Sequence, residues 1–203
     1  MVGEKGAAVD QAFQSGELGD LRHVGSRSGC GKIRESNEMT LPPVTETAMP
    51  HPSDPETESD VADRLTVSEA VARMSLSIDR GDWSDARLCF AEDVVTDYAS
   101  LTGAESAKVT ADDLVLGWSD ALSKLDAVQH LMGTPVVTVR GGRAECWVTG
   151  QVSHCFGGER WVIGGIYRYN LLRHGGAWLI THAAFKLQWE DGDRAVMTRA
   201  AKG

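Results

Sequence analysis

Three glycine pairs constrain the fold of this chain more than any other feature. Gly141-Gly142, Gly157-Gly158 and Gly175-Gly176 separate stretches that are rich in Val, Ile, Trp and Tyr. A glycine pair favours a tight hairpin turn, because glycine adopts positive φ angles without a steric penalty. The spacing therefore predicts a series of antiparallel strands. These predicted strands lie at 127–132, 134–140, 143–156, 160–173 and 177–189.

The preceding part of the chain has helical periodicity. An apolar stripe from Val67 to Ile78 recurs at spacings of three and four residues, which is typical of an amphipathic helix. Thr66-Val-Ser-Glu69 has the pattern of a capping box at the start of that helix. Asp82 and Thr110 are expected to cap two further helices, with a short strand at 93–99 between them. Helices followed by an antiparallel meander indicate an α+β fold.

The 203 residues divide into three parts by composition. Residues 1–60 are rich in Gly, Ser, Pro, Glu and Thr and show no apolar period, so we expect a disordered N-terminal tail or linker. Residues 61–190 form the predicted domain, and residues 191–203 a C-terminal tail. The long strands carry apolar residues on both faces, so one face is expected to pack against the helices and the other against a second subunit. We therefore expect a homodimer or a higher homo-oligomer.

Composition also argues against several functional classes. The net charge is −9, and no basic patch interleaved with aromatic residues suggests a nucleic-acid partner. No apolar run approaches the roughly 20 residues that span a membrane, and the first residues lack the apolar core of a signal peptide. The four cysteines show neither a C-x-x-C spacing nor a zinc pattern. These features predict a cytoplasmic protein with no nucleic-acid or membrane partner.

Two histidines interrupt predicted strands that are otherwise apolar. His130 and His154, with Asp79, Asp97 and Tyr98 upstream, suggest acid/base chemistry inside a closed pocket. Each histidine could instead be a core residue that a backbone carbonyl satisfies, and Asp97 could bond a backbone amide near its strand end. Two histidines and a carboxylate could also form a facial triad for iron. Because no compact ligand motif marks such a site, we expect no metal and no other cofactor.

Six short segments, in this order and at this spacing, carry a family resemblance. They are Ile78–Trp83, Cys89–Ala91, Asp97–Ser100, Gln129–Gly133, Val152–His154 and Gly176–Trp178. Together they resemble the SnoaL-like branch of the nuclear transport factor 2-like superfamily, and within it scytalone dehydratase and related polyketide or steroid dehydratases. The resemblance implies a cone-shaped, curved antiparallel sheet that is packed by three N-terminal helices around a cavity.

The resemblance also implies roles for individual residues. Asp79 matches an aspartate that orients a histidine, and His154 matches that histidine. His130 matches the second catalytic histidine, and Tyr98 matches a tyrosine that holds a water near the substrate carbonyl. Tyr167 falls where the family has a polar residue that lines the pocket. We therefore take Asp79, His130, His154 and Tyr98 as candidate catalytic residues.

Tyr167, Asp97 and Trp118 are the candidate substrate-binding residues, although a tryptophan such as Trp118 could equally be packed in the core. Two positions depart from the dehydratase pattern, since Ile78 replaces a water-holding tyrosine and Gly165 a pocket serine. These departures indicate a different substrate or a changed function.

Dehydration of a β-hydroxy ketone requires a base for the α-proton and an acid for the leaving hydroxyl. A neutral imidazole can be the base, an imidazolium beside a carboxylate the acid, and a phenol can stabilise the enolate oxygen. The sequence thus predicts a cofactor-free dehydratase or isomerase that acts on an apolar, oxygenated cyclic molecule of polyketide, steroid or terpenoid type. The alternative is a non-catalytic module of the same fold that binds a hydrophobic small molecule or mediates dimerisation.

Overall fold

The computed structural model describes residues 58–202, so almost all of the predicted tail at 1–60 lies outside the described residues. The helices are α2 (Glu58–Arg80), α3 (Trp83–Leu88), α4 (Ala99–Thr102), α5 (Ala111–Leu122) and α6 (Ala195–Lys202). The strands are β1 (Phe90–Asp97), β2 (Ala107–Thr110), β3 (Ala127–Met132), β4 (Val136–Arg140), β5 (Arg143–Phe156), β6 (Glu159–His174) and β7 (Ala177–Gly192). The predicted α+β class is confirmed.

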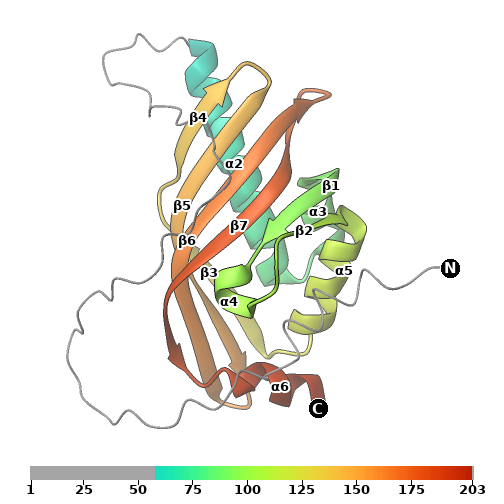
Figure 1. The fold of residues 1–203 in the computed structure, drawn as a ribbon, viewed down its shortest axis with the longest axis vertical. Helices are drawn as coiled ribbons and strands as arrows, with labels where there is room; N and C mark the ends of the chain where they lie inside the picture. The colour runs from blue at the N-terminus through green and yellow to red at the C-terminus, as the bar shows by residue number, and fades with distance from the viewer. Residues whose placement is uncertain (1–57, 203) are drawn as a thin grey trace, which may run out of the picture. The chain divides into compact units, whose positions relative to one another are not determined.

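The strands form one sheet of seven, in the order β2-β1-β7-β6-β5-β3, and β4 pairs with β5 beyond β3 along the same edge (Figure 1). The three glycine pairs form the turns of the β4–β5, β5–β6 and β6–β7 hairpins, as predicted, and Gly157 and Gly158 both have positive φ angles. All pairs are antiparallel except β1 with β7, which run parallel. The first strand of the domain therefore pairs with the last.

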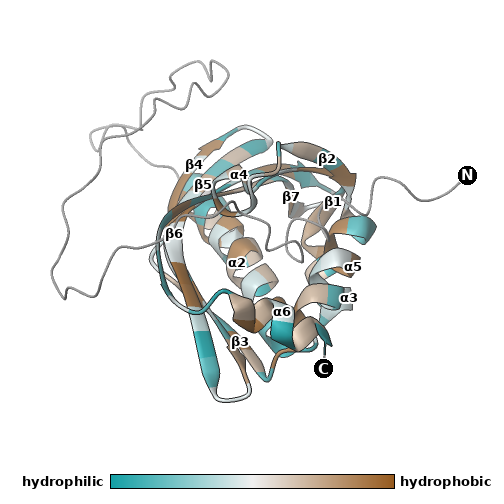
Figure 2. Ribbon diagram, turned by 60° about the horizontal axis from the view of Figure 1, so that its bottom comes forward, coloured by the Kyte–Doolittle hydropathy of each residue, from teal (hydrophilic) through white to brown (hydrophobic). Residues whose placement is uncertain are grey.

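The sheet curls around the helices, which lie against its inner face (Figure 2). The long helix α2 packs against β3, β4, β5 and β7, and α5 packs against β1 and β2. The apolar stripe predicted for α2 is buried: Val67 is fully buried and Ile78 is 6% exposed. Apolar side chains on the inner face of β5, β6 and β7 complete this core, so the period-two pattern of the sequence determines which side of the sheet is covered.

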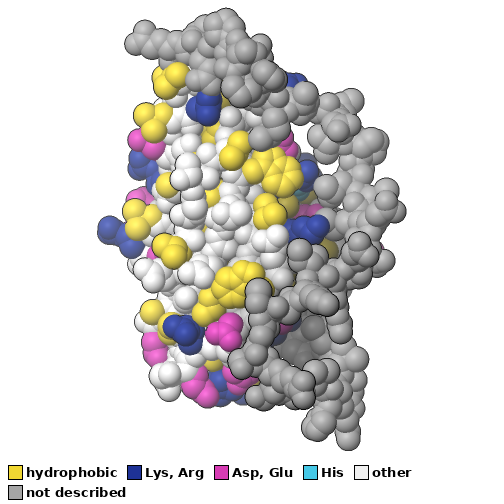
Figure 3. All heavy atoms as spheres, turned by 90° about the vertical axis from the view of Figure 1, so that its left-hand side faces the viewer, with side chains coloured by type: hydrophobic (Ala, Val, Ile, Leu, Met, Phe, Trp, Pro, Cys, Tyr) yellow, Lys and Arg dark blue, Asp and Glu magenta, His cyan; other side chains and the backbone are white. Residues whose placement is uncertain are grey.

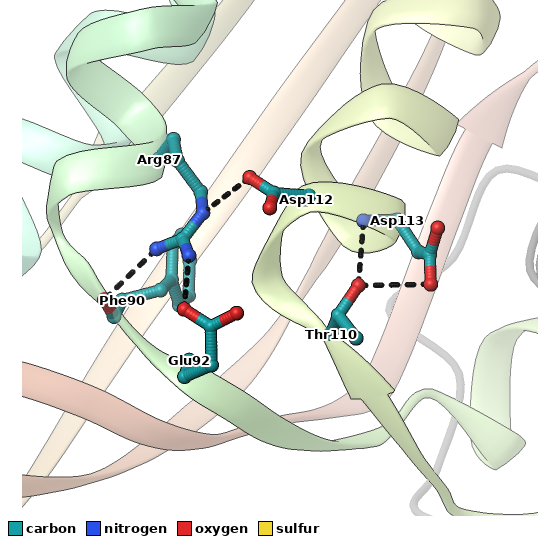
Figure 4. A network of polar contacts seen from close by, with 6 residues as sticks. All are labelled: Arg87, Phe90, Glu92, Thr110, Asp112 and Asp113. Atoms are coloured by element: carbon teal, nitrogen blue, oxygen red, sulfur yellow. Dashed lines mark hydrogen bonds and ion pairs between the residues drawn. The ribbon is translucent and has the colours of Figure 1, made fainter.

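Of the helix caps predicted at Thr66, Asp82 and Thr110, only the one at Thr110 forms the expected side-chain hydrogen bond. Thr110 caps α5, because its hydroxyl accepts a hydrogen bond from the backbone N–H of Asp113 at 3.1 Å (Figure 4). The capping box predicted at Thr66 is wrong, since α2 already begins at Glu58 and the Thr66 hydroxyl donates back to the carbonyls of Ala62 and Asp63. Asp82 occupies the N-cap position of α3 but makes no side-chain cap bond.

One guanidinium fixes the short helix α3 against its neighbours. Arg87 Nε donates to Asp112 at 2.6 Å, its Nη2 to Glu92 at 2.9 Å, and its Nη1 to the carbonyl of Phe90 at 3.3 Å (Figure 4). These bonds join α3 to the start of β1 and to the first turn of α5. The carboxylates of Asp112 and Glu92 raise the pKa of Arg87, and the planar guanidinium suits this three-way contact.

The C-terminal residues are ordered and contribute to the core. Residues 191–203 were expected to form a tail, yet β7 continues to Gly192 and α6 follows it. Val196, Met197 and Ala200 of α6 are buried, and α6 packs against β5 and β6. None of the helices within residues 58–202 is long and apolar enough to cross a membrane.

Candidate active site

A cavity of about 70 Å³ lies between the helices and the inner face of the sheet. Its wall is mostly apolar, and its titratable side chains are two imidazoles and three phenols, from His130, His154, Tyr98, Tyr167 and Tyr169. The apolar lining residues are Met74, Ile78, Leu101, Trp118, Leu122, Val152, Ile163 and Phe185. The volume is several times the roughly 15 Å³ that one water needs. A mostly apolar cavity with a few convergent polar groups is typical of a small-molecule site.

The strand register places both histidines on the inner face of the sheet. His130 of β3 pairs with Val152 of β5, and Val128 of β3 pairs with His154. Residues that lie opposite each other, or two apart along one strand, share a face. His130 and His154 are therefore diagonal neighbours that point into the same cavity.

Asp79 binds His130. The carboxylate accepts from Nδ1 of His130 at 2.5 Å and from the backbone N–H of the same residue at 2.8 Å. Both oxygens are thus engaged by one residue, and the two side chains are only 18% and 14% exposed. Because a carboxylate only accepts, the neutral ring carries its proton on Nδ1, which leaves Nε2 with a free lone pair.

This pairing differs from the one that the resemblance implied. Asp79 was expected to orient His154, but the end of α2 lies against β3, which carries His130. His154 lies on β5 and has a backbone partner instead. The carboxylate therefore lies beside His130 and not beside His154, which is the reverse of what the resemblance implied.

His154 is 3% exposed and lies against the neighbouring indole. Its ring stacks on Trp161 with centroids 4.9 Å apart, and its Nδ1 is 3.3 Å from the carbonyl oxygen of Trp161. Burial lowers the pKa of His154 from 6.5 to about 4; the bond to the Trp161 carbonyl opposes this shift, and the charge of His130 adds to it. His154 is consequently a neutral imidazole near pH 7. The imidazolium acid proposed from the sequence is therefore not available at this position.

The carbonyl partner also defines the tautomer of His154. A carbonyl oxygen can only accept, so Nδ1 of His154 carries the proton and Nε2 is an acceptor. The indole of Trp161 is held in turn, since its Nε1–H donates to Glu190 at 3.0 Å and the Arg194 guanidinium lies 5.0 Å from its ring centroid. Both imidazoles thus present acceptor nitrogens rather than donors.

The other candidate residues divide into two groups. Tyr98, Tyr167 and Trp118 line the cavity with the histidines. Asp97 does not belong to the cavity lining, and its carboxylate accepts from the backbone N–H of Ala99 at 3.3 Å. This contact is the backbone-amide alternative considered for Asp97, which lies on the other face of β1 from the buried Thr96.

A metal site of the facial-triad kind is not assembled in the described part of the chain. Within residues 58–202, no group of three His, Cys, Asp or Glu side chains could hold a metal ion. Asp79 and His130 are bound to each other.

Sequence reasoning missed Tyr169 and Phe185, which line the cavity from β6 and β7. The signal for Tyr169 was its spacing of two residues from Tyr167, which places both on one face of a strand. The departure at Gly165 also has a structural reason. A Cβ there would lie 2.2 Å from the backbone oxygen of Lys186 and 2.7 Å from the Phe185 ring, so no side chain fits at this point of the sheet.

Comparisons with known proteins agree with this architecture. The family model of the SnoaL-like domain matches residues 59–184. A protein from Kribbella flavida is 19% identical with a TM-score of 0.64, over 68% of this chain and 97% of the other. A proposed scytalone dehydratase from Novosphingobium aromaticivorans is 13% identical with a TM-score of 0.61, over 68% and 92%.

A hexachlorocyclohexane dehydrochlorinase from Novosphingobium barchaimii is 14% identical with a TM-score of 0.54, over 66% of this chain and 91% of the other. No curated protein matches the sequence. At these identities the structures show a common fold, whereas the family model covers more than half of the chain. The chain therefore belongs to the SnoaL-like domain family, whose nuclear transport factor 2-like fold its helices and curved sheet display.

Proposed function

We propose that this protein is a cofactor-free lyase or isomerase that removes a proton next to the carbonyl group of an apolar, cyclic small molecule. The observation that carries this proposal is the pair formed by Asp79 and His130 at the wall of an apolar cavity. The similarity in fold to a proposed scytalone dehydratase and to a dehydrochlorinase, both named for eliminations, supports the same class of reaction.

His130 is the base in this mechanism. Its Nε2 lone pair accepts the α-proton, and Asp79 stabilises the imidazolium that forms, because the carboxylate already binds Nδ1–H at 2.5 Å. The electron pair of the broken C–H bond forms a C=C bond while the carbonyl π pair moves to oxygen, which gives an enolate.

For a β-hydroxy ketone, the enolate then collapses, the C–O bond to the hydroxyl breaks, and the imidazolium of His130 returns its proton to the leaving oxygen. The products are an enone and water, and His130 is neutral again. His154 is neutral near pH 7 and its Nε2 carries no proton, so a single histidine, His130, serves first as base and then as acid. His154 Nε2 instead accepts a hydrogen bond from the substrate hydroxyl. An isomerase would return the proton to another carbon.

The test does not require the natural substrate. We would incubate the full-length protein in D₂O with a panel of cyclic ketones and cyclic β-hydroxy ketones and follow deuterium incorporation at the α-carbon by NMR. The wild type should accelerate exchange or elimination for at least one compound. Asp79→Asn should lower that rate about 10⁴-fold, because the carboxylate holds the catalytic histidine in the correct tautomer, and His130→Gln should abolish it. His182→Gln, on the outer face of the sheet, is the matched control.

Ligand binding without exchange or elimination for any compound would reject the enzyme proposal and favour the alternative, a binding module of the same fold. Normal rates in both the Asp79 and the His130 variant would reject this mechanism even if the protein is an enzyme.

The outer face of the sheet supports a second proposal, that the protein forms a homodimer. Val136 and Trp147 lie opposite each other on β4 and β5 and are 47% and 37% exposed, and Trp189 of β7 is 47% exposed. Figure 3 shows a face on which hydrophobic side chains spread over the middle while most charged side chains lie toward the margins. Light scattering during size exclusion tests this proposal: Trp147→Glu should convert a dimer to a monomer, whereas a monomeric wild type would reject it.

A further inference from the structure

Arg168 lies on the outer face of the sheet without an acidic partner. Its β6 neighbours Tyr167 and Tyr169 line the inner cavity, so the alternation along the strand directs Arg168 outward. Its guanidinium carbon lies 5.5 Å from the ring centroid of Trp147, its cross-strand partner on β5. Among residues 58–202, Arg168 forms no ion pair and no hydrogen bond through its side chain.

Other arginines that lie over an indole in this protein have a carboxylate as well. Arg173 lies over Trp178 and binds Asp63, and the guanidinium of Arg194 lies over Trp161 and pairs with a carboxylate of β7. A guanidinium has five N–H donors in a planar fork that matches a carboxylate. The half-buried side chain of Arg168 has lost part of its hydration without gaining such a partner, so it has the capacity to bind one.

A carboxylate without a partner lies on the same face. Glu145 is two residues from Trp147 on β5 and pairs with Asn170 on β6. Its side chain is half-buried and makes no hydrogen bond or ion pair with the part of the chain that the structure describes. Strands are about 4.8 Å apart, and two residues advance about 6.7 Å along a strand. Arg168 and Glu145 are therefore diagonal neighbours, about 8 Å apart at their Cα atoms.

Two further titratable groups lie beside this pair. The pKa of His182 is lowered by its burial and by the charge of Arg168, while Asp97 and Glu145 oppose the shift. His182 is therefore neutral near pH 7 and supplies no charge. The carboxylate of Asp97 already accepts the backbone N–H of Ala99. Glu145 is thus the carboxylate of this group that has no hydrogen bond of its own within residues 58–202.

The strand register allows a two-fold axis to bring these charges together. Trp147 lies opposite Arg168, and Glu145 lies opposite Asn170, so the four residues form the corners of a rectangle on the outer face. When two such faces pack against each other, the axis lies in the plane between them. An axis along the diagonal from Trp147 to Asn170 places each of these two against its own copy and exchanges the other two corners. Each Arg168 then faces the partner subunit's Glu145.

We propose that a second copy of this chain packs on the outer face with Trp147 against its own copy on the two-fold axis and with two reciprocal ion pairs, each between Arg168 and the partner subunit's Glu145. This inference rests on the proposed homodimer and assigns the register of its interface and the residues that determine it. The indole of Trp147, which is 37% exposed, is the apolar centre of the contact. A partner of a single charge would leave either Arg168 or Glu145 buried without a counter-charge.

The test exchanges charges and measures molecular mass, so it does not depend on turnover. Full-length wild type, Arg168→Glu and Glu145→Arg are studied by analytical ultracentrifugation over a series of concentrations. Each single variant sets like charges opposite each other in both pairs. We expect its dimer dissociation constant to rise at least about 100-fold. Arg80→Glu makes the same charge change at an exposed ion pair on α2; it is the matched control and should associate as the wild type does.

Mixing the two variants distinguishes reciprocal pairing from a general effect of charge. In a mixed dimer, both acidic groups of the Arg168→Glu chain face both guanidinium groups of the Glu145→Arg chain, so both pairs are attractive. We expect an equimolar mixture to form a heterodimer with a dissociation constant within about tenfold of the wild-type value. Thermal melting verifies that each variant is folded, and rescue on mixing requires folded chains.

The outcomes separate this inference from the proposals on which it rests. A monomeric wild type would overturn it together with the homodimer and would leave the outer face to a different partner. A wild-type dimer that persists unchanged in both variants would overturn this inference alone. Variants that are monomeric and stay monomeric when mixed would also overturn it, because their loss of association would not come from reciprocal pairs. None of these results bears on the chemistry of Asp79 and His130.

Discussion

Acid should destabilise this protein through His154, and the size of the effect follows from its burial. The side chain is 3% exposed, and its pKa is lowered from 6.5 to about 4 in the folded protein. The unfolded chain therefore binds a proton between these two values while the folded chain does not. Stability is retained above pH 6.5 and is lost as the pH falls toward 4. The full shift corresponds to about 3 kcal/mol of the free energy of unfolding.

Between pH 7 and pH 5 the linkage relation gives a loss of about 2 kcal/mol from this one residue. Urea unfolding, followed by tryptophan fluorescence at a series of pH values, measures the loss directly. Other groups also titrate, so the quantity of interest is the difference between the wild type and His154→Gln. Glutamine can still donate to the Trp161 carbonyl but does not titrate. His174→Gln, at the exposed end of β6, controls for the loss of an imidazole as such.

The difference between the wild type and His154→Gln should change by about 2 kcal/mol from pH 7 to pH 5. A direct NMR titration of the His154 ring should locate its midpoint near 4. A midpoint near 6.5, with a stability difference that is independent of pH, would refute the reasoning. It would show that the imidazole is solvated, and the assignment of His154 as a neutral acceptor would fail with it.

Three other predictions concern the scaffold and are read by the same unfolding assay. Arg87→Ala should lower the free energy of unfolding by about 1 kcal/mol, because it removes the hydrogen bonds that connect α3 to β1 and α5. Arg80→Ala removes only an exposed ion pair and should leave the free energy of unfolding nearly unchanged. Thr110→Ala should cost about 1 kcal/mol through loss of the α5 cap. Gly165→Ala should cost more than about 3 kcal/mol, since its Cβ would overlap a backbone oxygen, while Gly142→Ala meets nothing within 4 Å and should be neutral. An ordering other than Gly165 above Arg87 and Thr110 would contradict these assignments.

Much of the fold could be predicted because its signals are local. The glycine pairs define their hairpins through neighbouring residues, and the strand from 143 to 156 has the predicted bounds. The parallel pairing of β1 with β7 is not local, and nothing in either segment specifies its partner. The β2 strand has only four residues, Ala107–Thr110, too few for a period to emerge. The helix α6 was missed because its apolar residues Val196, Met197 and Ala200 are few and lie at the end of the chain.

In the candidate site, too, some features follow from local sequence patterns and others depend on how distant elements pack. Strand parity was sufficient to place His154 on an apolar face, and the structure puts it in the cavity wall. The partner of Asp79 could not be derived in this way. It depends on whether the end of α2 lies over β3 or over β5, which is a matter of helix packing. The state of His154 likewise depends on Trp161, whose carbonyl approaches only through the β5–β6 pairing.

The parallel pair of β1 and β7 has a consequence for the order in which this protein acquires structure during synthesis. Phe90 pairs with Ile180, ninety residues later in the chain. At about 5–20 residues per second, a ribosome takes several seconds to make the intervening segment. The β5–β6–β7 hairpins can form from neighbouring residues, but β1 must wait for the last strand. Because α4 and β7 both supply cavity residues, Leu101 and Phe185 among them, a nascent chain that ends before β7 would have an open, apolar inner face. In this topology, the pairing of β7 with β1 is the step that completes the wall of the cavity.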